Sequence, residues 1–305
     1  MLKKLFLTGV SVLFVFSVYA SQTLNIITST TDLASIASEI GGKAVKAESL
    51  SRGDIDPHRV DPRPSMVMKA RAADLAIVMG MDLDIWMDSV LEASKNSKVI
   101  RGGAGYLDVS ARIDKMGLPE GRVDGRRGHI HIHGNPHFWN SPEEGLVIAE
   151  DIYLKLKELS PENSDYFTKN YNAFSEKLRK KTVEWKKRLA PYTGAHIVLF
   201  HDSWPYFMRC MGLETALFVE PQPGIPPSAA HTAKVIKQIK ERGLKLLISE
   251  NYQDKRTIRR IEEETGIKAL VLPASVGGVK GIDDYISLIE HNVSMIEKVL
   301  GGSKE

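Results

Sequence analysis

The chain has 305 residues, with 41 Lys and Arg against 38 Asp and Glu and a single cysteine. This near balance of charge gives no reason to expect nucleic acid or an anionic membrane surface as a partner. The lone Cys210 excludes an intrachain disulfide, and the length exceeds what one hydrophobic core usually organises, so two domains are expected.

The first twenty residues have the layout of a secretory signal. A short basic start, Met1–Lys4, is followed by the apolar run Leu5–Val18 and by the small residue Ala20. A membrane anchor is the alternative, but the run is about 14 residues long and a bilayer span needs roughly 20. We therefore expect cleavage near Ala20, which leaves 39 basic and 38 acidic residues. No cysteine lies near the cut, so a soluble periplasmic protein is expected rather than a lipoprotein.

The first half of the remaining chain alternates short apolar strands with helices. Residues 23–29 and 44–50 predict strands on either side of a helix at 31–37. A helix at 65–73 then precedes a strand at 75–80 that is apolar throughout, as strands buried on both faces are. This alternation is typical of an α/β layer with a mainly parallel sheet.

A long helix is predicted over residues 162–189, which contain neither glycine nor proline. Its apolar residues recur near helical spacing between charged ones, and at 1.5 Å per residue it would be roughly 40 Å long. Pro161 is suited to its first turn, and Pro191 lies just beyond its end. We interpret it as a rigid connection between two lobes; the alternative is a helix packed on one domain.

Beyond this helix the α/β alternation resumes. Strands are predicted at 196–200, 244–249 and 268–272, and helices at 228–242, 257–265 and 282–300. The chain is therefore divided into a signal peptide (1–20), an N-terminal α/β lobe (21–160), a linker helix (161–192) and a C-terminal α/β lobe (193–305).

Three histidines stand in separate short motifs. His58 and His137 each follow a proline, which restricts the backbone before the ring, and His201 directly follows the strand predicted at 196–200. Open α/β sheets bind ligands at the carboxyl ends of their strands. Neutral imidazole is the commonest metal ligand, and three imidazoles suit a cation such as Zn²⁺. Each histidine alone is more often structural, but the three together predict a metal site assembled by the tertiary fold.

The motifs around these histidines, in their order along the chain, resemble one transport family. They are Asp56-Pro57-His58, Asp61-Pro62-Arg63-Pro64-Ser65, Asn135-Pro136-His137-Phe138-Trp139 and Phe200-His201-Asp202-Ser203-Trp204-Pro205-Tyr206-Phe207. The family is that of the periplasmic zinc/manganese solute-binding proteins of ABC importers, the ZnuA/TroA-like proteins of cluster A-I. The resemblance extends over essentially the whole chain after residue 20.

The resemblance implies two α/β lobes with mainly parallel sheets, one rigid helix between them, and a metal site in the inter-lobe cleft. His58 and His137 would come from the first lobe and His201 from the second. Members that select manganese tend to have a carboxylate in place of His201, so the three imidazoles favour Zn²⁺, with Mn²⁺ second. The implied partners are the divalent metal ion and the membrane subunits of an ABC permease, and the implied state is a monomer.

The sequence departs from the family at the fourth ligand. The resemblance implies an aspartate where this chain has Ala274, and no carboxylate occurs between Lys268 and Lys280. Glu250, at the end of a predicted strand, is the candidate fourth ligand; a water molecule, or no further protein ligand, is the alternative. Glu250 could equally orient His201, as could Asp202.

A histidine-rich segment precedes His137. His129, His131 and His133 alternate with other residues, so in an extended chain they lie on one face. Zinc-type members resemble this in having a histidine-rich loop nearby. We predict a low-affinity auxiliary metal loop; the alternative is a solvent-exposed loop whose histidines have no role.

Two other functions fit three histidines with an open fourth position. One is a binding protein for a metal chelate, in which a small chelator completes the coordination shell. The other is an exported zinc hydrolase. The sequence has no His-Glu-x-x-His helix, nucleophile elbow or Gly-rich phosphate loop, so a non-enzymatic transport function is expected.

Overall fold

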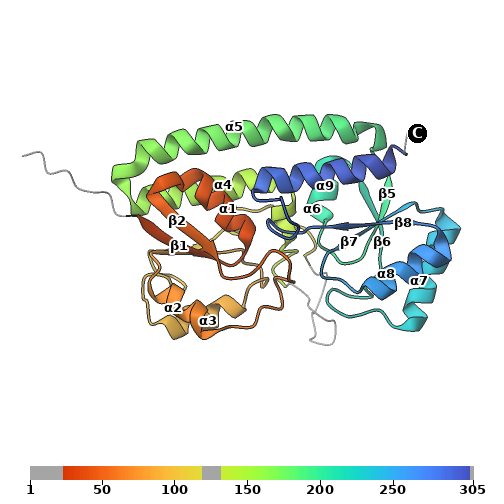
Figure 1. The fold of residues 1–305 in the computed structure, drawn as a ribbon, viewed down its shortest axis with the longest axis horizontal. Coiled ribbons are helices and arrows are strands. Elements are labelled where there is room, and N and C mark those ends of the chain that lie inside the picture. Colours follow the sequence, from red (N-terminus) through yellow and green to blue (C-terminus); the bar gives the residue numbers. More distant parts are fainter. Residues whose placement is uncertain (1–22, 119–131, 303–305) are drawn as a thin grey trace, which may run out of the picture.

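Two parallel four-stranded sheets lie side by side in the computed structural model, which describes residues 23–118 and 132–302 (Figure 1). The predicted signal peptide lies outside these residues. The first sheet has the order β2-β1-β3-β4 and the second the order β6-β5-β7-β8. The predicted fold class, two α/β lobes with mainly parallel sheets, is confirmed. None of the helices in the described ranges combines the length and apolarity that a membrane span needs.

The first sheet is buried on both faces because its side chains alternate across the strands. Ile26 and Ile77 point into a core beneath one layer of helices, whereas Ile27, Ala76 and Val78 contact the opposite layer. The strands are β1 (Leu24–Thr28), β2 (Val45–Ser49), β3 (Leu75–Val78) and β4 (Tyr106–Asp108). The helices are α1 (Thr31–Gly41) and α4 (Pro142–Leu159) on one face, and α2 (Pro64–Arg71) and α3 (Trp86–Ser94) on the other (Figure 1).

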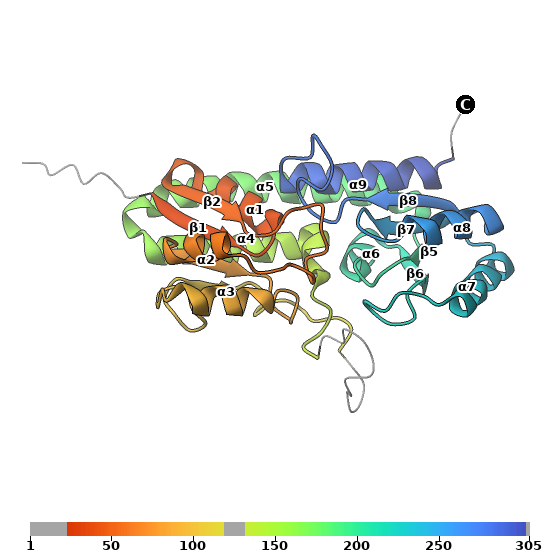
Figure 2. The same cartoon turned by 60° about the horizontal axis from the view of Figure 1, so that its bottom comes forward.

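The second sheet repeats this layered arrangement. Its strands are β5 (His196–Leu199), β6 (Glu214–Phe218), β7 (Leu246–Glu250) and β8 (Lys268–Leu272). The helices α7 (Ala229–Arg242) and α8 (Lys255–Thr265) cover one face, and α6 (Pro205–Met211) and α9 (Tyr285–Leu300) lie on the other (Figure 2). The strands β4 and β6, both at sheet edges, were not predicted.

The predicted long helix is α5 (Ser164–Leu189), 26 residues that run along both lobes (Figure 1). It begins after a short 3₁₀ turn at Pro161–Asn163 and ends before another at Ala190–Tyr192. It packs on α1 and α4 of the first lobe and on α6 and α9 of the second. Arg188 donates hydrogen bonds to Glu290 and Glu297 of α9. The helix is therefore fastened to both lobes along its length.

The two lobes also share one hydrophobic core. A single cluster of buried side chains contains Ile26 of the first sheet, Trp185 of α5 and Ile197 of the second sheet. A large rearrangement of the lobes would expose this apolar surface to water, which costs roughly 25 cal/mol of free energy for each Å². We therefore expect only modest opening of the space between them. The lobe boundaries at residues 160 and 193 stay a prediction.

A segment of the second lobe, residues 273–284, contacts the first lobe directly. The Asp32 carboxylate at the start of α1 accepts a hydrogen bond from the Val276 amide at 3.0 Å. The Trp139 indole donates to the Ala274 carbonyl at 2.8 Å. The hydroxyl of Tyr285, the first residue of α9, donates to the Trp139 carbonyl at 2.6 Å. These buried contacts fix how the two lobes face each other.

The burial of the Asp32 carboxyl makes the free energy of unfolding depend on pH. Burial raises the pKa of Asp32 from 3.8 to about 6. Because the unfolded chain loses this proton at lower pH than the folded one, the free energy of unfolding falls as pH rises from about 4 to about 6. Asp32→Asn keeps an oxygen that can accept from Val276 but has no titratable proton. The variant should lack this pH-dependent fall in the free energy of unfolding, which amounts to at most about 3 kcal/mol. Urea unfolding of the metal-free proteins at pH 4.5 and 7 measures it; equal pH dependence in variant and parent would contradict it.

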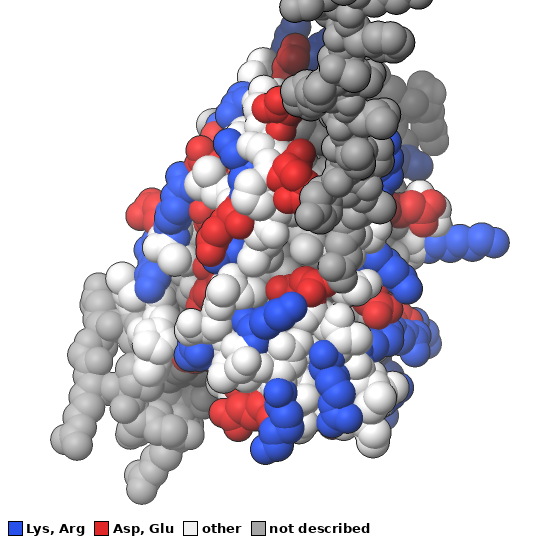
Figure 3. Space-filling view, turned by 90° about the vertical axis from the view of Figure 1, so that its left-hand side faces the viewer, with Lys and Arg blue, Asp and Glu red and all other residues white. Residues whose placement is uncertain are grey.

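Acidic and basic side chains are interspersed on the end of the first lobe that faces the viewer in Figure 3. Among the exposed ion pairs of the first lobe, the Lys69 ammonium lies 2.8 Å from the Glu48 carboxylate, and both side chains are more than 40% exposed. Exposed pairs of this kind contribute little to stability. This end of the molecule carries charges of both signs, and Lys and Arg predominate in the lower part of the view.

Candidate metal centre

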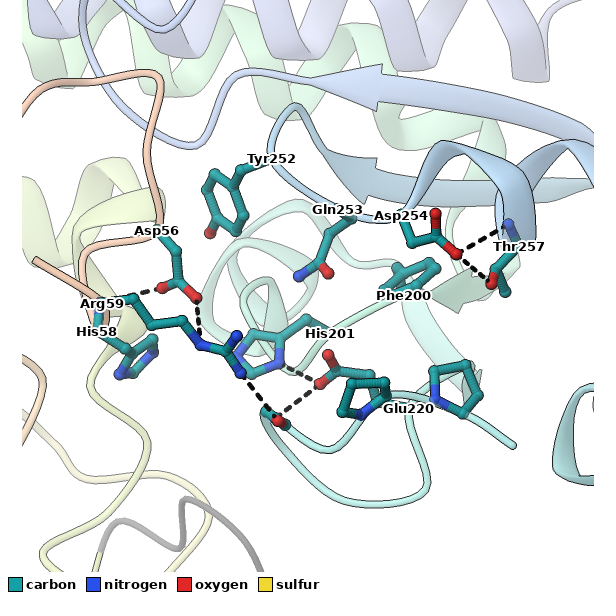
Figure 4. A pocket seen from close by; sticks show the side chains of 13 residues that line it. Asp56, His58, Arg59, Phe200, His201, Glu220, Tyr252, Gln253, Asp254 and Thr257 are labelled. Atoms are coloured by element: carbon teal, nitrogen blue, oxygen red, sulfur yellow. Dashed lines mark hydrogen bonds and ion pairs between the residues drawn. The ribbon is translucent and has the colours of Figure 1, made fainter. Parts of the chain in front are cut away.

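The fold brings the three predicted histidines together between the two sheets. His58 lies in the loop between β2 and α2, His137 begins a 3₁₀ turn at His137–Asn140, and His201 lies two residues beyond the end of β5. The loops that carry them follow the carboxyl ends of parallel strands. In each lobe these strand ends face the other lobe (Figure 1). Figure 4 shows His58 and His201 facing the same space from opposite lobes.

The ring nitrogens are close enough to share one cation. The Nε2 atoms of His58 and His137 are 3.0 Å apart, and one nitrogen of each of the three rings lies within 4.8 Å of the others. Nitrogens that bind one tetrahedral Zn²⁺ at 2.0–2.1 Å are about 3.3 Å apart. Small adjustments of the rings would therefore complete a three-imidazole site.

The His137 ring is aimed by Asn135. The Asn135 side-chain oxygen accepts from both the backbone amide and Nδ1 of His137, each at 2.9 Å. Because Nδ1 donates this bond, the lone pair of the neutral ring is on Nε2, which faces His58. The Asn135 amide group in turn donates to the Asp202 carbonyl at 2.8 Å, so the supports of His137 and His201 are linked.

The loop that carries His58 is held in place by two hydrogen bonds. The Asp56 carboxylate accepts from the His58 backbone amide at 2.9 Å, a turn typical of aspartate two residues before its donor. The Trp86 indole donates to the Pro57 carbonyl at 3.1 Å. These contacts reduce the freedom of the loop before any metal binds.

His201 is held by Glu220, which the sequence analysis did not identify. The Glu220 carboxylate accepts from Nδ1 of His201 at 2.6 Å, and the His201 residue is only 5% exposed. Its Nε2 is buried and has no hydrogen-bond partner among the described residues. Burial alone would lower the pKa of His201, but the hydrogen bond to Glu220 and the charge of Glu250 outweigh it and raise the pKa.

Glu250 lies in the interior near this site, at the end of β7. It is 1% exposed, one carboxylate oxygen accepts from the Trp204 indole at 2.8 Å, and the other has no hydrogen-bond partner in the described chain. Burial raises the pKa of Glu250. Within the described residues, the group of converging ligand atoms consists of the three histidines without Glu250. Its role as fourth ligand stays a prediction.

Two further positions from the sequence analysis can be placed. Ala274, where the resemblance implies an aspartate, is 2% exposed and lies in the segment bonded to Trp139. Burial raises the pKa of Asp202 to about 6. The Asp202 carbonyl is bonded to Asn135, whereas His201 Nδ1 is bonded to Glu220. A role of Asp202 in orienting His201 therefore stays a prediction.

The histidine-rich segment is only partly described. His129 and His131 lie outside the described residues. His133 is placed in the first lobe, where its Nε2 is 3.9 Å from an Asp82 carboxylate oxygen. It is not part of the three-histidine group.

A cavity of about 290 Å³ opens beside His58 and His201. Its walls carry Asp56 and Arg59 from the first lobe and Glu220, Tyr252 and Asp254 from the second (Figure 4). Charged and apolar side chains thus share the walls of the cavity beside two of the three histidines.

The model of the family described as zinc-uptake complex component A, periplasmic (ZnuA), matches residues 26–299. The chain belongs to this family. The ZnuA-type chain is 27% identical over 292 residues to the iron-binding protein YfeA of Yersinia pestis, covering 92% of this chain and 88% of YfeA. It is 24% identical over 289 residues to the zinc-binding lipoprotein AdcA of Streptococcus pneumoniae, with 92% of this chain and 56% of AdcA covered. The chain thus spans little more than half of the AdcA sequence.

The solved structures show the same fold. A crystal structure of ZnuA superposes on this ZnuA-type chain with a TM-score of 0.77, covering 91% of this chain and 99% of that one at 24% identity. The predicted resemblance to the ZnuA/TroA-like proteins is confirmed.

Proposed function

We propose that this protein is the extracytoplasmic metal-binding component of an ABC importer, which captures Zn²⁺ and delivers it to the transmembrane subunits of a permease. The observation that carries the proposal is the convergence of His58, His137 and His201, whose ligand nitrogens all lie within 4.8 Å of one another. Membership of a family described as a periplasmic zinc-uptake component supports it.

Zn²⁺ is the proposed ion because the converging ligands are all imidazoles. Imidazole nitrogen suits Zn²⁺, whereas Mn²⁺ is better served by carboxylate oxygen. Mn²⁺ is therefore proposed as a weaker competitor. The relatives are named for different metals, iron for YfeA and zinc for AdcA, so their names do not indicate which metal this chain prefers. We therefore base the proposed preference for Zn²⁺ on the ligands of this chain.

We propose Glu250 as the fourth ligand, because its buried carboxylate has an oxygen without a hydrogen-bond partner in the described chain. Its charge also acts on His201. Ligation requires the side chain to move, since it lies outside the converging group. Calorimetric titration of Zn²⁺ should show at least about tenfold weaker binding for Glu250→Ala than for the parent protein. Equal affinity would eliminate Glu250 and leave water as the fourth ligand.

We propose that His129, His131 and His133 form an auxiliary loop that collects metal weakly. Ordering a loop costs conformational entropy, so binding there should be weaker than in the cleft. Replacing all three by alanine should remove the weak equivalents of bound Zn²⁺ measured by equilibrium dialysis and leave the tight one. Loss of the tight equivalent, or no change in the weak ones, would contradict this role.

We propose capture by a cleft that opens only modestly. The shared core and α5 restrain the lobes, so docking to the permease supplies the interactions that separate His201 from His58 and His137. Before capture, the protein is exported, cleaved near Ala20 and acts as a soluble periplasmic monomer. N-terminal sequencing and light scattering of the exported protein test these last points.

A metal chelate is the second candidate cargo. A cavity of about 290 Å³ beside the histidines is larger than a bare ion needs, since a water molecule occupies about 30 Å³. In that case a small chelator would supply the fourth donor. We do not propose hydrolysis, the other alternative from the sequence.

The test of the proposed function is metal analysis of protein purified without chelators and without added metal. We expect close to one equivalent of zinc in the parent protein and strong depletion in His58→Ala. His231→Ala, a histidine on α7 that lies outside the three-histidine group, is the control. Equal metal content in parent and His58→Ala would contradict the proposal. Mass spectrometry of the bound fraction distinguishes a bare ion from a chelate.

A further inference from the structure

Glu220 occupies a position beside His201 that depends on the pairing of two strands. It follows β6, which lies parallel to β5, and its backbone amide donates to the Phe200 carbonyl at 3.0 Å. Its side chain is 8% exposed. One carboxylate oxygen, Oε2, accepts from His201 Nδ1 at 2.6 Å and from the Gly224 amide at 2.8 Å. A single oxygen therefore holds both the ring and the loop after it.

The loop in question comprises residues 220–227, here called the Glu220 loop. A short antiparallel bridge joins Gln222 to Ile225, and Gly224 has a φ of +75°, a conformation that favours glycine. The Glu220 loop is thus folded around the carboxylate that orients His201. A change in the loop would disturb the hydrogen bond to the ring.

The first lobe contacts the Glu220 loop through Arg59. The Arg59 guanidinium donates to the Gly224 carbonyl at 3.1 Å across the mouth of the cleft (Figure 4). It also pairs with the Asp56 carboxylate at 3.6 Å, which in turn accepts from the His58 backbone amide. The supports of His58 and His201 are therefore connected on the solvent side of the metal site.

We propose that Glu220 is the positioning residue of the metal site, and that Gly224 and Arg59 make the orientation of His201 depend on closure of the cleft. The inference rests on the proposed function. When Nδ1 donates to Glu220, the Nε2 lone pair is directed to the cation and the ring becomes a stronger donor. When the Arg59 contact breaks, the Glu220 loop is released and the ion leaves faster.

The role of Glu220 is tested by Zn²⁺ affinity, measured by competition with a chromophoric chelator, and by the visible spectrum of the Co²⁺ form. Loss of such an outer partner costs about 10- to 100-fold in metal affinity. We expect Glu220→Ala to show this loss and an altered Co²⁺ spectrum. The amide oxygen of Glu220→Gln can still accept from Nδ1, so its Zn²⁺ affinity and Co²⁺ spectrum should be closer to those of the parent.

A matched control lies in the same sheet. The Glu214 carboxylate is 3.4 Å from Nδ1 of His196, but both side chains are more than half exposed. Glu214→Ala should leave Zn²⁺ affinity and the Co²⁺ spectrum unchanged.

The role of Arg59 is tested by the rate of Zn²⁺ release into excess chelator. Loss of one hydrogen bond of roughly 0.5 to 1.5 kcal/mol corresponds to about 2- to 10-fold faster release. We expect this for Arg59→Ala, with a Co²⁺ spectrum like that of the parent. Arg52→Ala is the control, because Arg52 pairs with Asp54 at the surface of the same loop.

Zn²⁺ affinity of Glu220→Ala within twofold of the parent, with an unchanged Co²⁺ spectrum, would overturn the role of Glu220. Unchanged release from Arg59→Ala would overturn the coupling to cleft closure. If Glu220→Ala does not fold, Glu220→Asp takes its place in the test. Its shorter side chain should weaken Zn²⁺ binding, and a parental Zn²⁺ affinity of this variant would overturn the inference. If His58→Ala also binds Zn²⁺ with parental affinity, the proposed function itself fails. If His58→Ala loses Zn²⁺ but the Glu220 and Arg59 variants keep parental affinity and release rate, only this inference fails.

Discussion

His201→Ala should weaken Zn²⁺ binding at neutral pH by more than the roughly 100-fold that loss of an outer partner can cost, because it removes a direct ligand. His201 is the member of the three-histidine group that the second lobe supplies. Without it, the histidine ligands would all come from the first lobe. Chelator competition measures the affinity, and the release rate should rise in parallel.

The control for this experiment is His196→Ala. His196 begins β5, the strand that leads to His201, but its side chain is 52% exposed and faces Glu214. We expect parental affinity for this variant. His201→Ala with parental affinity would show that His201 is not a ligand and would contradict the proposed three-histidine site.

Zn²⁺ affinity should fall steeply as pH decreases. An imidazole with an ordinary pKa of about 6.5 is roughly 3% neutral at pH 5, so three such ligands would reduce affinity by about four to five orders of magnitude. Although burial opposes it, the hydrogen bond to Glu220 raises the pKa of His201, so protons compete for this ligand at higher pH than for an ordinary imidazole. The fall should therefore begin near or above pH 6.5.

This dependence is measured by chelator competition between pH 5.0 and 7.5, with the chelator calibrated at each pH. The logarithm of the dissociation constant should approach a slope of three protons per ion at the acid end. Circular dichroism at each pH excludes unfolding as the cause. Full Zn²⁺ affinity at pH 5 would be incompatible with imidazole ligands.

The elements that the sequence predicted best have strong local signals. The strand Leu75–Val78 is apolar throughout because both faces of its sheet are covered by helices. The helix α5 lies between Pro161 and Pro191, which set its ends within a few residues. The three histidine motifs were predicted to converge because proline and strand ends fix the backbone next to each histidine, and the three rings do lie together.

The features that the sequence did not predict depend on long-range pairing. The edge strand Glu214–Phe218 is only partly buried and alternates poorly, so it has no clear period. Its pairing with β5 includes a register irregularity between Ile197 and Val198. The contact of Glu220 with His201 follows from that register. The sequence analysis named Glu250 and Asp202 as groups that could orient His201, and Glu220 could not be added to them before the fold was known.

The rigid connection inferred from the long helix was only part of the arrangement. The helix does extend over both lobes, but a shared core and residues 273–284 also join them. Ala274 takes part in this second connection, through its carbonyl and the Trp139 indole. Where the family resemblance implies a metal ligand, this chain has a buried structural contact. The methyl side chain of Ala274 offers no ligand atom, and the contact with Trp139 is made by the backbone carbonyl.

The most direct measurement is X-ray diffraction from crystals grown with Zn²⁺, with data collected on both sides of the zinc absorption edge. We predict one strong anomalous peak in the cleft, 2.0–2.1 Å from a ring nitrogen of each of His58, His137 and His201. A fully occupied zinc bound elsewhere, with these three rings left uncoordinated, would contradict the account.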